Sequence, residues 1–128
     1  MTTTFHDSYA RTHEYIRTLA SRGPEALQIL GGLAQDHEDW YVRGEAAAAL
    51  GHLGGGQAVR LLEALAQDTD EYVRMAVAEA LTRIGGPEAL KVLEALAQDT
   101  DEYVRMAAAE ALDQAGRPTT SLGRRPRP

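Results

Sequence analysis

The chain has 128 residues, of which 44% are hydrophobic, with no cysteine and a net charge of −6. This length corresponds to one domain, and the absence of cysteine excludes a disulfide framework, thiolate chemistry and a sulfur-ligated metal. No stretch approaches the roughly 18 consecutive apolar residues of a membrane span, and the N-terminus lacks a charged stretch followed by an apolar one. We therefore expect a soluble, cytoplasmic protein.

A repeat of 31 positions organises most of the chain. The fifteen residues LEALAQDTDEYVRMA at Leu62–Ala76 recur unchanged at Leu93–Ala107. A looser comparison finds three copies, at residues 23–54, 55–85 and 86–116. A period of this size is typical of stacked supersecondary units. Such a stack offers an extended surface and, by default, no catalytic pocket.

In chain order, the first predicted element is a helix over Thr4–Ser21, which lies outside the repeat phase, so residues 1–22 are assigned as an N-terminal capping helix. Each repeat then divides into two helices at its glycines and its acidic loop. The last copy shows this most clearly. Pro87 is suited to the first turn of a helix that ends near Gln98. Asp101 is the expected N-cap of a second helix over about Glu102–Ala115, and Gly116 its left-handed C-terminal cap.

The net charge conceals a partition along the chain. Residues 23–115 hold 17 acidic and 6 basic side chains, a balance of −11. Residues 117–128, predicted as a basic disordered tail, add four arginines and no acidic residue. The repeats should repel nucleic acid and attract basic partners, whereas the tail has the opposite preference.

The second helix of each repeat has two faces. In the middle copy, helical spacing predicts that Val73, Val77, Ala80, Leu81 and Ile84 pack inward. The opposite stripe carries Tyr72, Met75, Ala76, Glu79 and Arg83. Because the repeats stack at a constant period, equivalent positions of this stripe form columns across the molecule. The columns are Tyr41, Tyr72 and Tyr103; Gly44, Met75 and Met106; Ala48, Glu79 and Glu110; and His52, Arg83 and Gln114.

The second helices also share a Val-Arg-x-x-Ala-Ala-x-Ala-Leu pattern, complete at 104–112 and 42–50 and nearly so at 73–81. With this pattern the chain resembles HEAT-repeat proteins, in particular the short HEAT-like repeats named after phycobilisome lyases, over about residues 22–116. The resemblance implies a right-handed α-solenoid of about three two-helix repeats. It also implies that Arg43, Arg74 and Arg105 are structural and bridge to loop carboxylates, for which the candidates are Asp68, Asp70, Asp99 and Asp101.

In the family, the second helices line the concave face, which is the usual binding surface. Carried over to this chain, the resemblance assigns ten residues to partner binding: Trp40, Tyr41, Tyr72, Met75, Glu79, Arg83, Tyr103, Met106, Glu110 and Gln114. Tyrosine and methionine on an exposed stripe supply adaptable contact area. The alternative is that they cover loops and fill gaps between repeats. Trp40 has the same two interpretations.

Neighbouring helices lie roughly 8–10 Å apart, so Glu79 and Glu110 suit a basic ligand better than a shared proton. They are alternatively a solvated charged face. The four histidines have no metal-site spacing, and no nucleophile motif or phosphate-binding loop is present. We predict no catalytic residue, metal or cofactor.

We therefore expect a non-catalytic interaction module or scaffold that binds a basic, partly apolar peptide or protein on the concave face. Two alternatives are a lyase-like subunit in chromophore attachment and a self-assembling solenoid, paired as a homodimer through its C-terminal repeat. Nucleic acid is expected to bind only weakly, through the tail, and no membrane is expected as a partner. The tail is either a solubilising end or a segment that docks into an acidic groove.

Overall fold

The structure, a computed structural model, describes residues 5–116, with side chains from Ala10 onward. The predicted tail (residues 117–128) and Thr4 lie outside the described residues. Every element in the described part of the chain is helical. In chain order these are α1 (Phe5–Ser21), the 3-10 turn η1 (Gly23–Ala26), α2 (Leu27–Asp36), α3 (Trp40–Leu53), α4 (Gly55–Leu65), α5 (Glu71–Ile84), α6 (Pro87–Leu96) and α7 (Glu102–Gln114).

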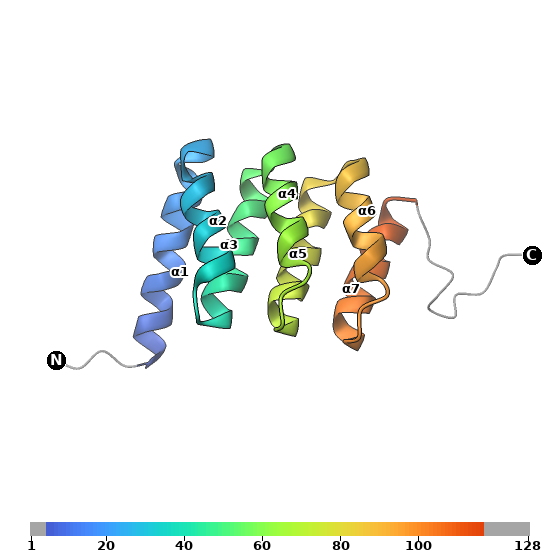
Figure 1. The fold of residues 1–128 in the computed structure, drawn as a ribbon. Coiled ribbons are helices and arrows are strands. Elements are labelled where there is room, and N and C mark those ends of the chain that lie inside the picture. The colour runs from blue at the N-terminus through green and yellow to red at the C-terminus, as the bar shows by residue number, and fades with distance from the viewer. Residues whose placement is uncertain (1–4, 117–128) are drawn as a thin grey trace, which may run out of the picture.

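The helices stack side by side in two layers (Figure 1). One layer contains α2, α4 and α6, and the other contains α3, α5 and α7, with each helix packed against its neighbours in the same layer and in the other layer. The predicted all-α solenoid is therefore confirmed. The helix α1 packs mainly against α3 and so extends the α3–α5–α7 layer at its N-terminal end.

One helix end differs from its predicted place for a local reason. The helix α6 ends at Leu96 rather than near Gln98, because the N–H groups of Gln98 and Asp99 bond to carbonyls three residues back, as in a 3-10 turn. At the next helix, the predicted cap is confirmed. The Asp101 carboxylate accepts hydrogen bonds of 2.9 and 3.1 Å from the N–H groups of Tyr103 and Val104, the second and third residues of α7. Gly116 has φ +80°, as the predicted left-handed C-cap requires.

The core is a line of leucines between the two layers. The predicted inward residues Val73, Val77, Ala80 and Leu81 are buried, and Ile84 is partly buried. Each fully buried leucine contributes about 1.5–3 kcal/mol relative to an exposed one. The leucines that are fully buried, at equivalent places in successive repeats, are Leu30, Leu62 and Leu93 in the first layer and Leu50, Leu81 and Leu112 in the second.

Glycines bring α3 and α5 unusually close together. A Cβ atom added at Gly51 would lie 2.7 Å from the Cβ and 2.8 Å from the backbone Cα of Ala80, so the two backbones are nearly in contact there. A Cβ atom added at Gly44 would lie 2.3 Å from the ring of Tyr72. These contacts require the absence of a side chain on α3. As a result, α3 and α5 pack closely along this seam.

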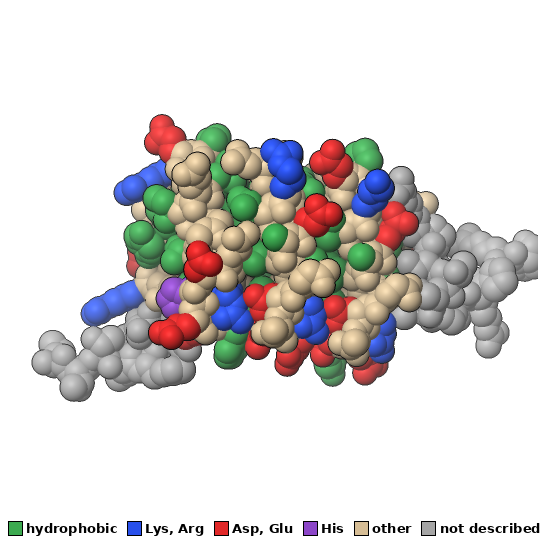
Figure 2. Space-filling model, viewed as in Figure 1, with side chains coloured by type: hydrophobic (Ala, Val, Ile, Leu, Met, Phe, Trp, Pro, Cys, Tyr) green, Lys and Arg blue, Asp and Glu red, His purple; other side chains and the backbone are tan. Residues whose placement is uncertain are grey.

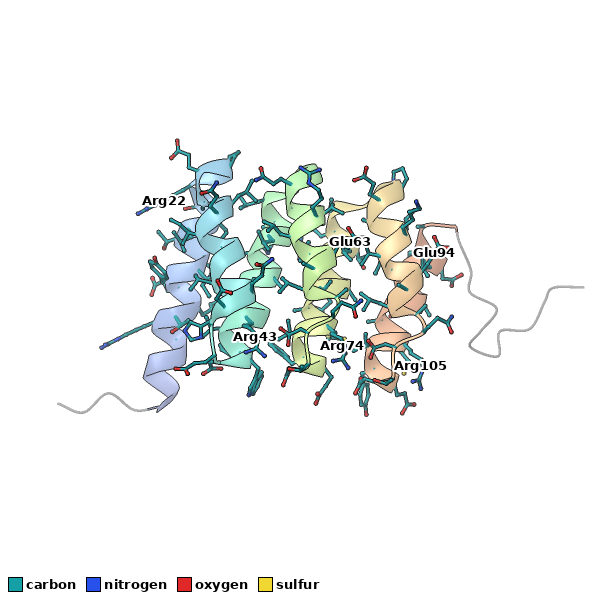
Figure 3. All side chains as sticks on the ribbon, viewed as in Figure 1. Arg22, Arg43, Glu63, Arg74, Glu94 and Arg105 are labelled. Carbon is teal, nitrogen blue, oxygen red and sulfur yellow. The ribbon has the colours of Figure 1, made fainter. Side chains whose placement is uncertain are left out.

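Arginines tie each repeat to the next at one end of the helices (Figure 3). The Nε and Nη2 groups of Arg43 donate to both oxygens of Asp68, at 3.0 and 3.1 Å. Arg74 does the same to Asp99, at 2.8 and 3.1 Å. The remaining Nη1 of each arginine donates to carbonyl oxygens of its own loop, as does that of Arg105. The structural role of these arginines therefore has a direct geometric basis.

The arginines select only two of the four candidate carboxylates. Asp70 and Asp101 instead cap α5 and α7, so they are not the ion-pair partners. Burial would raise the pKa of Asp99, but the hydrogen bonds from Arg74 and from the Asp101 N–H outweigh it, so this pKa lies below its usual value. Among the described residues, Arg105 has no carboxylate partner, because no further repeat follows it there.

Candidate functional site

The ten predicted partner-binding residues lie on α3, α5 and α7, and all are exposed or half-buried. We call this surface the candidate face. The structure divides it into an aromatic cluster at the start of α3 and α5 and a groove between α5 and α7. It buries one member of the predicted stripe, Ala76, which is only 7% exposed. Gly44, at the head of the methionine column, is buried as well, because the ring of Tyr72 lies over it.

The aromatic cluster consists of Trp40, Tyr41 and Tyr72. The Trp40 and Tyr72 rings meet edge to face with centroids 5.1 Å apart, and Tyr41 stacks on Tyr72 at 6.0 Å. Such contacts contribute about 0.5–1.5 kcal/mol each beyond the area that they bury. Trp40 nevertheless remains 46% exposed. The cluster is therefore a preformed aromatic surface, in which Tyr72 packs against its neighbours and is also partly exposed.

Hydrogen bonds connect Tyr72 to two preceding helices. Its hydroxyl donates to Glu45 of α3 at 3.3 Å, and the same carboxylate contacts the Nδ1 of His13 on α1. Burial and, next, the nearby charge of Glu45 raise the pKa of Tyr72 to about 12. Sequence reasoning did not select His13 or Glu45. The sequence feature that could have identified Glu45 is that the other two repeats have alanine at the equivalent position.

Tyr103 has a different environment, although the fifteen residues around Tyr72 and Tyr103 are identical. The ring of Tyr72 lies against Gly44, but the equivalent position before Tyr103 is Met75, whose side chain occupies that space. The position equivalent to the hydrogen-bond acceptor Glu45 is Ala76. Tyr103 is consequently 66% exposed, and Met106 beside it on α7 is 54% exposed. These two side chains are the apolar part of the candidate face that is least engaged within the described chain.

A groove of about 380 Å³ lies between α5 and α7. At this seam α5 carries Met75, Glu79 and Thr82, at the positions where α3 has Gly44, Ala48 and Gly51. Larger side chains hold the helices apart, in accordance with close-packing of helix surfaces. The residues that line the groove are Glu79, Thr82, Arg83, Ala107, Glu110, Ala111 and Gln114.

Four of the ten predicted residues therefore line this groove together: Glu79, Arg83, Glu110 and Gln114. Two carboxylates and one guanidinium leave the groove with a negative charge, and the alanine methyl groups of α7 line part of its wall. A long basic side chain matches this chemistry, because its aliphatic stem packs on apolar surface while its charged end meets carboxylates. The sequence did not single out the lining residues Thr82 and Ala111.

Other parts of the surface offer less. A hollow of about 480 Å³ runs along α1 and has mixed charges, but it contains none of the predicted residues. Within the described chain, no three His, Asp or Glu side chains are gathered as metal ligands. None of the described helices has both the length and the apolar character to cross a membrane.

Comparison with known proteins identifies the repeat. The family model for HEAT repeats matches residues 6–67 and, in a second overlapping match, residues 32–113. The first match begins within α1, the helix that extends the α3–α5–α7 layer. The curated proteins contain no match to this chain. The phycobilisome-lyase-like subtype stays a prediction. Since the matched segments cover most of the chain, the protein belongs to the HEAT-repeat family.

Proposed function

We propose that the protein is a non-catalytic interaction module that binds a basic, partly apolar peptide or protein segment on the candidate face. HEAT repeats generally mediate protein–protein interaction. The observation that carries the finer proposal is the proximity, on α7, of exposed Tyr103 and Met106 to a groove that contains Glu79 and Glu110. Aromatic and methionine side chains are enriched at interfaces, where they bury area at low cost in ordering.

Electrostatics favours the same class of partner. The repeats carry 17 acidic and 6 basic side chains between residues 23 and 115, so their field attracts a basic segment and speeds its association. The aromatic cluster extends the binding surface toward the N-terminus. Its three rings are held by mutual contacts, so an apolar partner residue on Trp40 would order few additional side chains.

A peptide selection tests this proposal. Peptides selected from a random library on the wild-type chain should contain Lys or Arg beside an apolar residue. The double variant Glu79→Gln/Glu110→Gln should lose about tenfold in affinity, equivalent to about 1.4 kcal/mol, with a weaker salt dependence than the wild type. Tyr103→Ala/Met106→Ala should weaken the same peptides without unfolding the chain, since both side chains are exposed.

A matched control lies on the opposite layer. Glu63 and Glu94 are exposed on α4 and α6 at equivalent places, and Figure 3 shows them on those helices. The variant Glu63→Gln/Glu94→Gln removes the same two charges away from the candidate face and should bind the peptides with unchanged affinity. Selected peptides that are acidic, or that bind the groove variant as tightly as the wild type, would contradict the proposal.

The homodimer through the C-terminal repeat is a second candidate, supported by one observation. Arg43 and Arg74 each hold a carboxylate of the next repeat, whereas Arg105 makes only its contacts to loop carbonyls in the described chain. A second copy that supplies a carboxylate to Arg105 would complete the series. Light scattering should then give twice the chain mass, and Arg105→Glu should return it to the monomer value. A monomer mass for the wild type at high concentration would exclude this candidate.

A further inference from the structure

We propose that the groove between α5 and α7 is the binding site of the chain's own basic C-terminal segment, residues 117–128, from the same molecule. This inference rests on the proposed function, because it takes the groove to be a surface that binds basic chain. Beyond the proposed function, the inference identifies which chain segment occupies the groove. An outside partner would then have to displace this segment, so the protein would regulate access to its own binding face.

Charge complementarity is the first argument. The segment holds Arg117, Arg124, Arg125 and Arg127 and no acidic residue, whereas the groove presents Glu79 and Glu110 from two neighbouring helices. Arginine forms its strongest hydrogen bonds with carboxylates, often two at a time. The alanines of α7 in the groove wall provide a surface for the aliphatic stems.

Chain length is the second argument. Gln114 lines the groove, and the described chain ends two residues later at Gly116. The lining part of α7, from Ala107 to Gln114, spans about 10 Å at about 1.5 Å per residue. The eight residues from Gly116 to Arg124 reach about 26–29 Å when extended. The paired arginines therefore have ample length to return along α7, and the positive φ of Gly116 turns the chain away from the helix axis.

The position of the groove is the third argument. Between α3 and α5, by contrast, Gly51 lies against the backbone of Ala80, so little space is left between those two helices there. The groove also includes α7, from which the segment continues. Arg83 is the one lining residue that opposes a basic occupant, being a cation in the same groove. Arg83→Gln removes this cation and should therefore strengthen binding of the C-terminal segment in the groove.

Attachment to the same chain compensates for the weakness of contacts in an open groove. A short flexible connection gives an effective concentration of about 1 mM. If the free segment binds with a dissociation constant of about 0.1 mM, the attached segment fills the groove about ten times as often as it leaves it empty. An outside basic peptide should therefore bind about tenfold more weakly than it would to an open groove.

The test uses full-length chains and a labelled synthetic peptide with the sequence TTSLGRRPRP, residues 119–128. Binding is measured by fluorescence anisotropy. The chain with Arg124→Gln, Arg125→Gln and Arg127→Gln should bind the peptide about tenfold more tightly than the wild-type chain does. In that background, Glu79→Gln/Glu110→Gln should weaken binding of the peptide about tenfold, whereas Glu63→Gln/Glu94→Gln should leave it unchanged. Circular dichroism would establish that each variant is folded.

Three outcomes would overturn the inference. The peptide binds the wild-type and neutral-tail chains equally, or it does not bind the neutral-tail chain, or the difference between the two chains depends on protein concentration. The last result would indicate a segment supplied by a second molecule. Library-selected peptides are measured on the same variants. If they require Glu79 and Glu110 while the tail peptide does not bind, this inference fails and the proposed function stands.

Discussion

Replacing Arg74 by Ala should uncouple the last repeat from the middle one, and Arg105→Ala is its natural control. The two arginines lie in identical fifteen-residue blocks and both donate to carbonyls of their own loops. Only Arg74 also pairs with a carboxylate of the following repeat, Asp99. The difference between the two variants therefore isolates the inter-repeat ion pair.

The expected magnitude follows from the burial of the pair. The side chains of Arg74 and Asp99 are only 13% and 10% exposed. Removing one partner of a fully buried pair costs about 3–5 kcal/mol, because the other charge is left without compensation, and this partly buried pair should lie near the lower end of that range. Arg105→Ala loses only hydrogen bonds from a charged donor, about 1–3 kcal/mol. The resulting gap of about 1–2 kcal/mol is measurable against the total of about 5–15 kcal/mol that is typical for a domain.

Urea denaturation followed by circular dichroism measures both losses. In a linear repeat array, weakening one interface should also separate the unfolding of the last repeat from that of the others, which broadens the transition. Adding Asp99→Ala to Arg74→Ala should restore part of the loss, because the unpaired carboxylate is then absent. Equal destabilisation by Arg74→Ala and Arg105→Ala would refute the reasoning, since it would leave the inter-repeat carboxylate without effect.

Four further outcomes are expected. Because the pKa of Asp99 is lower in the folded chain than in the unfolded chain, its carboxylate stabilises the fold at pH values above its unfolded pKa. That stabilisation is lost as pH falls through the pKa of Asp99 in the folded chain. The extra destabilisation by Arg74→Ala, measured by urea denaturation, should therefore shrink below about pH 4. Gly51→Ala should be destabilising in thermal unfolding, because overpacking against the Ala80 backbone costs about 1–3 kcal/mol and helix propensity returns about 1 kcal/mol. Gly44→Ala gains the same propensity but displaces the Tyr72 ring from two aromatic contacts of about 0.5–1.5 kcal/mol each, so its net cost should be about 0–2 kcal/mol, and tryptophan fluorescence would report the displaced ring. Tyr72 should titrate at about pH 12 when its ionisation is followed by ultraviolet absorbance, because burial and the charge of Glu45 favour its neutral phenol. Glu45→Gln removes that charge and should lower the pKa of Tyr72.

Much of the local structure can be predicted from the sequence because it depends on neighbours along the chain. Helical spacing of apolar residues marks the helices, and aspartate before each second helix marks its start. Asp101 is a cap because its carboxylate reaches N–H groups two and three residues ahead, which any chain of this local sequence can arrange. The leucines that form the core are buried for the same reason, since their faces follow from the helical period.

The arginine partners needed the tertiary structure. From the sequence, Asp68, Asp70, Asp99 and Asp101 were all candidate partners, with no aspartate assigned to a particular arginine. The fold separates their roles, since the second aspartate of each loop turns to its own helix and leaves the first to face the preceding repeat. That choice depends on how two repeats pack, which local sequence does not specify.

The candidate face shows the same division. The sequence by itself determined the period, the helices and most of the exposed stripe, because these follow from each repeat's own residues. Only the tertiary structure decided that Tyr72 packs over Gly44 whereas Tyr103 stands exposed, and that Glu79 and Glu110 face one groove. The physical reason is that a side chain in a stacked repeat packs against the repeat before it. Identical blocks therefore have different surroundings wherever their preceding neighbours differ in size, as Gly44 and Met75 do.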